Sequence, residues 1–273
     1  MLRVARKIAD AFVEHNLLTY AAAIAFQALV ALVPLSILGL ALLGALGLDS
    51  VWTDSVAPAI HGRVTQPVYH AIDYTARRVL SSGSAGVIAF SAALSTWYLA
   101  AAMRAVMEAL NMIHDVHDPR PWWRRALLAV GLGVGCGVAL IGSVLIVTAA
   151  PRVGGAADVL AGVGRWLAAL VLLMTAIALL VRFAPAEHPQ PRWASAGSVL
   201  VVCSWIVASL VFRYLVSVAN FKSPTGSLTA LLMITGYLFV SSTVFLVGVQ
   251  LDEILRQETG GRARGLLDLA RRG

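Results

Sequence analysis

The sequence predicts an all-α, polytopic integral membrane protein with six transmembrane helices. The first observation is that the chain contains six apolar stretches without a charged residue. The second is the composition, which is 59% hydrophobic and only 13% charged, with a mean hydropathy of +0.81. The third is length, because a helix of roughly 20 apolar residues already crosses the hydrocarbon core of a bilayer. These stretches lack the alternation of barrel strands, so each is expected to be a helix that satisfies its own backbone.

The six spans form one transmembrane domain, residues 17–255, and lie at about residues 17–48, 84–103, 126–150, 165–181, 193–212 and 228–251. The first span is longer than a bilayer core requires. Pro34 lies in its middle, and a proline there removes a helix hydrogen bond, which predicts a kink. This span is expected to be retained in the membrane, because no small-residue cleavage site follows it.

Two kinds of segment flank or interrupt these spans. Residues 1–16 have apolar and charged residues at helical spacing, which predicts an amphipathic helix in the membrane interface, with a disordered leader as the alternative. Residues 49–83 contain a similar stripe, which predicts outer amphipathic helices between the first two spans. Residues 256–273 are interpreted as a flexible basic cytoplasmic tail.

The distribution of the 21 Lys and Arg residues predicts the orientation. If both termini are cytoplasmic, the inner segments hold 14 of these residues and the outer segments hold 7. Such a bias favours N- and C-termini on the cytoplasmic side of the membrane. We therefore expect the positively charged residues to contact anionic headgroups of the inner leaflet, although a net charge of +7 could also attract nucleic acid. Membrane lipids rather than nucleic acid are the expected partners.

A polar stripe at the end of the second span is the first candidate functional feature. Arg104, Glu108 and Asn111 follow one another at helical spacing, and Arg104 and Glu108 form an i,i+4 pair. At the cytoplasmic boundary the pair would be a solvated face, whereas deeper in the membrane it would be a functional ion pair. Gln27 and Gln250 are polar residues inside other spans, and with the stripe they form the candidate polar pathway or coupling site.

The third span is rich in glycine. Gly131 with Gly135, and Gly133 with Gly137, form two GxxxG pairs, which allow close approach of helices. We interpret them as a packing seam, and the pattern leaves a homo-oligomer open. Cys136 and Cys203 lie inside spans and are interpreted as small core residues.

Signatures of enzymes and cofactors are missing from the sequence. There is no phosphate-binding loop, no HExxH and no nucleophile elbow, and lysine occurs only at positions 7 and 222. His114 and His117 could ligate a metal, but a solvated turn beside Pro119 is the favoured interpretation. We therefore expect no metal, no cofactor and no enzymatic activity.

Four segments of the chain carry recognisable motifs. They are AAAIAFQALVALVPL (21–35), ALNMIHDVHDPRPWWRRALLA (109–129), NFKSPTGSL (220–228) and LVGVQLDEIL (246–255). In this order the motifs resemble those of the YihY/BrkB family of bacterial inner-membrane proteins. The resemblance marks a set of structural motif residues: Arg120, Pro121, Trp123, Asn220, Gly226 and Ser227. It also shows departures, because Gln27 stands where an aromatic residue is common, and Gln250 replaces a typical glutamate.

The resemblance implies a six-helix inner-membrane fold and a role in virulence or in envelope transport. Our leading hypothesis is a transporter or flippase-like protein for a lipid or polar solute. The alternative is a scaffold that organises envelope assembly and moves nothing. A ribonuclease label also circulates for the family, but no metal-ligand cluster or general-base pair in this sequence favours it.

Overall fold

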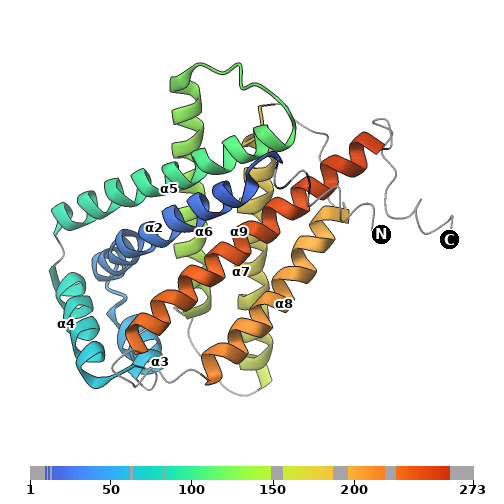
Figure 1. Cartoon of the computed structure of the whole chain (residues 1–273). Coiled ribbons are helices and arrows are strands. Elements are labelled where there is room, and N and C mark those ends of the chain that lie inside the picture. Colours follow the sequence, from blue (N-terminus) through green and yellow to red (C-terminus); the bar gives the residue numbers. More distant parts are fainter. Residues whose placement is uncertain are drawn as a thin grey trace.

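The computed structural model describes residues 10, 12, 14–61, 64–82, 84–148, 156–186, 196–218 and 226–258, and the regular structure in these ranges is helical (Figure 1). The predicted interfacial helix and basic tail lie largely outside these ranges. The elements are α2 (Leu17–Ala45), the π-helix η1 (Val51–Val56), α3 (Ala57–His61), α4 (Gln66–Ser82), α5 (Ala85–Ile113), α6 (Trp122–Thr148), α7 (Ala156–Phe183), α8 (Ala196–Val218) and α9 (Gly226–Glu258).

Five of the described helices are long and apolar enough to cross a membrane. They comprise α2, α5, α6, Ala161–Phe183 of α7 and Leu228–Gln257 of α9. The remaining predicted span corresponds to α8, whose described apolar part, Leu200–Val216, is shorter. The chain is therefore an all-α, multi-pass membrane protein.

Several helices are longer than their apolar runs. The second span was expected to end near residue 103, but α5 continues to Ile113. It continues because Arg104 and Glu108 lie on an exposed face, where charged residues do not interrupt a helix, and residues 104–113 include no proline or glycine. Conversely, α2 ends at Ala45, shortly before Gly47, whose φ of 67° is a turn conformation suited to glycine.

The proline in the first span does not end the helix. α2 passes through Pro34, which is buried, and the helix is assigned without interruption from Leu17 to Ala45. Pro34 lines a cavity of about 360 Å³ between α2 and the first turns of α5. The kink itself stays a prediction.

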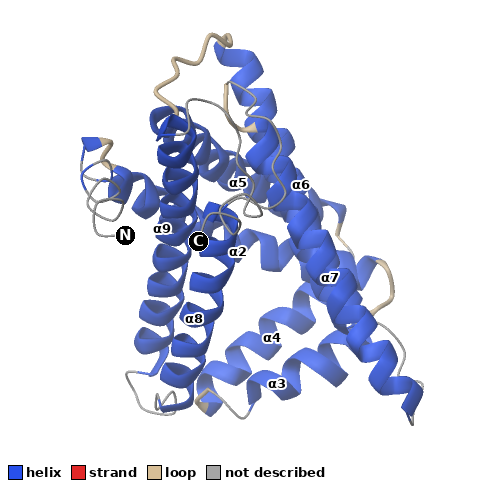
Figure 2. Cartoon of the chain, turned by 90° about the vertical axis from the view of Figure 1, so that its right-hand side faces the viewer, coloured by secondary structure: helices blue, strands red, loops and turns tan. Residues whose placement is uncertain are grey.

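The helices are arranged around α2 and α5. α2 packs against α5, α9 and α4, while α5 also packs against α6. α7 packs against α6, and α8 packs against α9, so the outer helices form two pairs. Figure 2 shows that the α6–α7 pair and the α8–α9 pair separate toward the end of the molecule at which α3 and α4 lie.

One of the two glycine pairs in α6 allows the close packing of α5. A Cβ atom at Gly133 would lie 3.0 Å from the backbone N of Ala100, and one at Gly137 would lie 2.9 Å from Leu99 Cδ1. By contrast, Gly131 and Gly135 have no atom within 4 Å of a Cβ position. The seam therefore uses the second pair, and the first pair faces outward.

Candidate functional site

The ends of several helices meet at the end of the molecule opposite to α3 and α4. Leu17 and Ala21 of α2, Ala109 and Ile113 of α5, and Leu246 of α9 form a buried apolar cluster there. Through these contacts the motif at residues 109–129 lies beside the motif at residues 246–255. Two segments far apart in the sequence thus form one site.

A buried carboxylate lies at the centre of this site. Glu253 of α9 is only 2% exposed. Its Oε2 lies 3.2 Å from Nδ1 of His114 and accepts a hydrogen bond of 2.8 Å from Nε of Arg256. Its Oε1 accepts hydrogen bonds from Nη2 of Arg256 at 2.9 Å and from Nε2 of Gln257 at 3.0 Å. We name His114, Gln250, Glu253, Arg256 and Gln257 the α9 carboxylate cluster.

His114 and Glu253 form a contact between two helices. The Nδ1 atom of His114 lies 3.2 Å from Oε2 of Glu253, although His114 Nδ1 has no aligned hydrogen bond among the described residues. The contact joins the end of α5 to α9 at the buried carboxylate.

Gln250 lies one helical turn before Glu253 on the same face of α9. Its side chain is 3% exposed, and its Oε1 is buried without a hydrogen-bond partner among the described residues. A buried acceptor left in this state costs roughly 1–3 kcal/mol. The oxygen is available to accept a hydrogen bond from water or from a bound solute.

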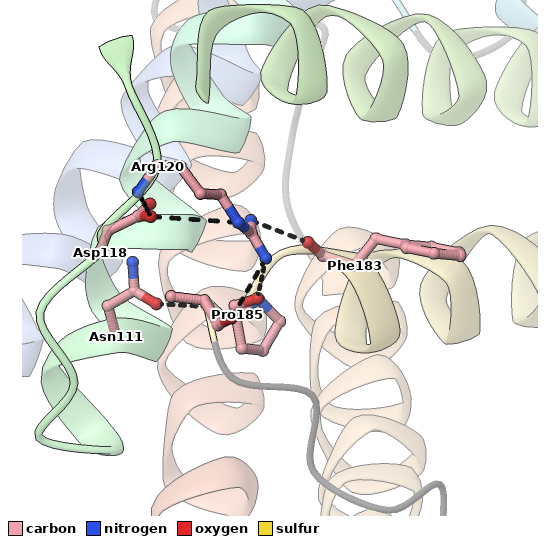
Figure 3. Close-up of polar contacts among 6 residues, drawn as sticks. Asn111, Asp118, Arg120, Phe183 and Pro185 are labelled. Atoms are coloured by element: carbon pink, nitrogen blue, oxygen red, sulfur yellow. Dashed lines mark hydrogen bonds and ion pairs between the residues drawn. The ribbon is translucent and has the colours of Figure 1, made fainter. Parts of the chain in front are cut away.

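A second set of polar contacts holds the end of α7 (Figure 3). Arg120 donates from Nη2 to the carbonyl oxygens of Pro185, at 2.6 Å, and Ala186, at 3.4 Å, and from Nη1 to that of Phe183 at 3.4 Å. Asn111 Oδ1 accepts a 2.9 Å hydrogen bond from the backbone N of Ala186. These contacts satisfy backbone groups that a helix end leaves free, and the guanidinium suits the negative end of the helix dipole.

Arg120 is itself positioned by Asp118. The backbone N of Arg120 donates to Asp118 Oδ1 at 2.9 Å, and the Arg120 Nε lies 4.0 Å from the same oxygen (Figure 3). Both side chains are largely buried, at 15% and 7% exposed. The loop between α5 and α6 is thus connected to the end of α7 through these two residues.

The structure brings together only part of the predicted polar pathway. Asn111 and Gln250 lie at the converging helix ends. Arg104 and Glu108 are exposed on α5, and Gln27 is half-buried in α2. Arg104 and Glu108 therefore do not line the α9 carboxylate cluster.

The other motif residues lie near helix starts. The Pro121 carbonyl accepts a hydrogen bond from the backbone N of Arg124 in the first turn of α6. Trp123 is exposed, and the Arg124 guanidinium lies 5.0 Å from its ring centroid. α9 begins at Gly226, followed by Ser227, whereas Asn220 lies outside the described residues.

The sequence reasoning did not identify Glu253 and His114 as partners. A signal for Glu253 was present, because it follows Gln250 by three residues within the motif LVGVQLDEIL and therefore shares its helical face. No sequence signal connected Glu253 to His114, which lies 139 residues earlier in the chain. Only the packing of α5 against α9 makes this connection.

The described side chains include no group of three or more His, Cys, Asp or Glu residues that could hold a metal ion. The contacts at the α9 carboxylate cluster are hydrogen bonds and charge pairs.

Comparisons with known proteins are consistent with a membrane protein family. A family model described as "Virulence factor BrkB" matches residues 8–271. A Bacillus subtilis protein named ribonuclease-like protein YfkH is 23% identical over 264 residues, which cover 92% of this chain and 94% of that protein. No solved structure matches this chain.

Proposed function

Because this chain belongs to the Virulence factor BrkB family, we propose that it is a membrane transport protein that moves a lipid-like or polar solute across the bacterial cytoplasmic membrane. The observation that carries this proposal is the buried, unpartnered Oε1 of Gln250 beside the buried carboxylate of Glu253. Both residues lie in α9, one of the helices suited to cross the membrane.

Polar groups inside a membrane helix are costly, and their presence points to a function. A polar atom that is buried in such a helix without a partner loses the hydrogen bonds that water would supply. Gln250 Oε1 has no hydrogen-bond partner among the described residues, and a solute with a donor group would supply one. The α9 carboxylate cluster is accordingly proposed as a point of contact for the transported solute.

The arrangement of the helices supports movement around this cluster. The α6–α7 and α8–α9 pairs are connected through α2 and α5 (Figure 2). His114 and Glu253 join α5 to α9 where the pairs converge. Breaking this contact would let α9 move relative to α5, which provides a way to couple solute binding to movement.

The first experiment tests whether the cluster binds a solute. The protein is extracted gently from its native membrane, and the molecules that accompany it are identified by mass spectrometry, for the wild type and for Gln250→Leu. We expect a lipid or metabolite that the wild type retains and the variant loses. Glu108→Gln is the matched control, because Glu108 is an exposed residue of α5 and should leave retention unchanged.

The second experiment tests movement. Proteoliposomes carrying a fluorescent phosphatidylethanolamine are treated with dithionite, which bleaches only reporter that reaches the outer leaflet. We expect a tenfold lower rate for Glu253→Gln, equivalent to about 1.4 kcal/mol, and an unchanged rate for Glu108→Gln. If folded wild-type protein retains no solute and accelerates no movement, the transport proposal is wrong and the scaffold takes its place.

The name of the Bacillus subtilis relative suggests a nuclease test as well. Purified protein supplied with divalent metal ions is expected to leave RNA intact, because the α9 carboxylate cluster contains one carboxylate and one histidine and lacks a second acidic ligand. RNA cleavage that disappears in Glu253→Gln would contradict this part of the proposal.

A further inference from the structure

A pocket of about 540 Å³ lies near the opposite end of the molecule, between η1 and α4. It is open to the surface and its lining is mostly apolar, but charged side chains are among the residues that line it. The residues that matter for its chemistry are Asp49, Trp52, Tyr74, Arg77, Arg78 and Leu80. We name it the η1–α4 cavity. It is separate from the α9 carboxylate cluster and does not depend on the proposal of transport.

The inner side of this cavity is held firmly. Trp52 is 4% exposed, and its Nε1 donates a 2.9 Å hydrogen bond to Asp73 Oδ1. Arg77 Nε donates a 2.8 Å hydrogen bond to Asp73 Oδ2. On the same helix, the Leu80 carbonyl packs directly against Gly44 of α2, where no Cβ would fit. These contacts fix η1 and α4 against α2.

The charges that face the cavity are not compensated by one another. Both oxygens of Asp73 are occupied, and among the described residues Arg77 uses only its Nε. Arg78 donates from Nη1 to the neutral hydroxyl of Tyr74, at 3.0 Å. The exposed carboxylate of Asp49 forms no ion pair with Arg77 or Arg78, although all three line the same cavity.

This arrangement matches a ligand that carries one negative and one positive group. An anion alone would leave Asp49 facing a like charge, and a cation alone would meet two guanidinium groups. A phosphate between Arg77 and Arg78 would receive charge-assisted hydrogen bonds, for which guanidinium geometry is well suited. An ammonium a few atoms away would pair with Asp49 and contact the Tyr74 ring.

We propose that the η1–α4 cavity binds a zwitterionic phosphate ester of the phosphoethanolamine type. The cavity lies where α2 ends and shortly before α5 begins, and therefore near the membrane surface. Such a ligand can reach it either as a lipid headgroup or as a free solute. The two sources share the chemistry that the cavity recognises, and the experiment separates them.

The test uses the full-length protein. One arm measures binding of phosphatidylethanolamine in nanodiscs, with phosphatidylglycerol as the lipid that lacks the ammonium, by native mass spectrometry. The other arm titrates free O-phosphoethanolamine and inorganic phosphate into protein in micelles of an uncharged maltoside detergent, which carries no phosphate, by calorimetry. The variants are Asp49→Asn and Arg78→Gln, both exposed, with Arg104→Gln as a matched control on α5.

We expect phosphatidylethanolamine to bind more tightly than phosphatidylglycerol, and Asp49→Asn to abolish this preference. Arg78→Gln should weaken binding of phosphatidylethanolamine and of free O-phosphoethanolamine by about tenfold. Arg104→Gln should leave both affinities unchanged. Binding of the lipid alone identifies a headgroup site, and binding of free O-phosphoethanolamine identifies a solute site. Equal binding of the two lipids by the wild type, or affinities that neither variant changes, would overturn the proposal.

Discussion

At the scale of single residues, Glu253 of α9 and Glu108 of α5 differ in burial and in partners. Glu253 is buried among His114, Arg256 and Gln257, whereas Glu108 is exposed on α5. A buried carboxylate requires partners, because its loss of hydration is large. An exposed one requires none. The sequence predicted Glu108 as a candidate functional residue, whereas in the structure Glu253 is the glutamate that is buried among polar partners.

The two glutamates are expected to differ in their effect on stability. Glu253→Gln removes the charge that holds His114 and Arg256, and should lower the free energy of unfolding by about 1–3 kcal/mol. Glu108→Gln should change it by about 0.5 kcal/mol or less. Reversible unfolding in mixed micelles measures both. Equal losses for the two variants would show that the contacts of Glu253 contribute nothing.

Asp73 gives a prediction about pH. Hydrogen bonds from Arg77 and then from Trp52 lower the pKa of its carboxyl below the ordinary value of 3.8. The stabilisation is therefore present above the unfolded pKa and is lost as the pH falls through the lower folded pKa. Hydrogen exchange of residues 51–61 and 66–82, corrected for intrinsic rates, should show less protection at acid pH. In Asp73→Asn this acid-dependent change should be absent.

At the scale of elements, α6 shows how one helix presents two glycine faces. Gly133 and Gly137 contact α5 at Leu99 and Ala100, whereas Gly131 and Gly135 have open space around them. A GxxxG pattern identifies small residues at helical spacing, but it does not identify the neighbour. Only the position of α5 decides which pair is needed for packing.

Alanine substitutions in α6 should therefore separate the two pairs. Gly133→Ala places a Cβ against the backbone of Leu99 and Ala100 and should lower the midpoint of thermal unfolding. Gly131→Ala meets no atom within 4 Å and should leave the midpoint unchanged or raise it, because alanine favours a helix by about 1 kcal/mol over glycine. A decrease for Gly131→Ala alone would instead locate an interface on that face.

At the scale of the whole molecule, the helix ends define two sides. The start of α2, the end of α5 and the end of α9 share one apolar cluster, and Arg120 joins the end of α7 to the same region. η1 and α4 lie at the other end, attached to the end of α2. The bias in Lys and Arg predicts that the first side is cytoplasmic.

Cysteine labelling tests this orientation. In a background without Cys136 and Cys203, single cysteines are introduced by Ser82→Cys and His117→Cys, both at exposed positions of opposite ends. We expect an impermeant maleimide to label Ser82→Cys in intact cells, and His117→Cys only after the membrane is opened. Labelling in the reverse pattern would contradict the predicted orientation, and labelling of both in intact cells would contradict the two-sided arrangement.

The sequence by itself determined that the chain suits a lipid bilayer, that it is helical, and roughly where the long helices lie. A charge-free apolar run favours a membrane helix regardless of its neighbours. The sequence did not locate the end of α5, since charged residues on an exposed face leave a helix intact. The tertiary structure decided which polar residues meet. Asn111 bonds to Ala186, and His114 contacts Glu253, through packing between helices far apart in the chain. Helical periodicity places residues on a common face, but only the neighbouring helix determines whether that face is buried, and burial gives Gln250 and Glu253 their chemistry.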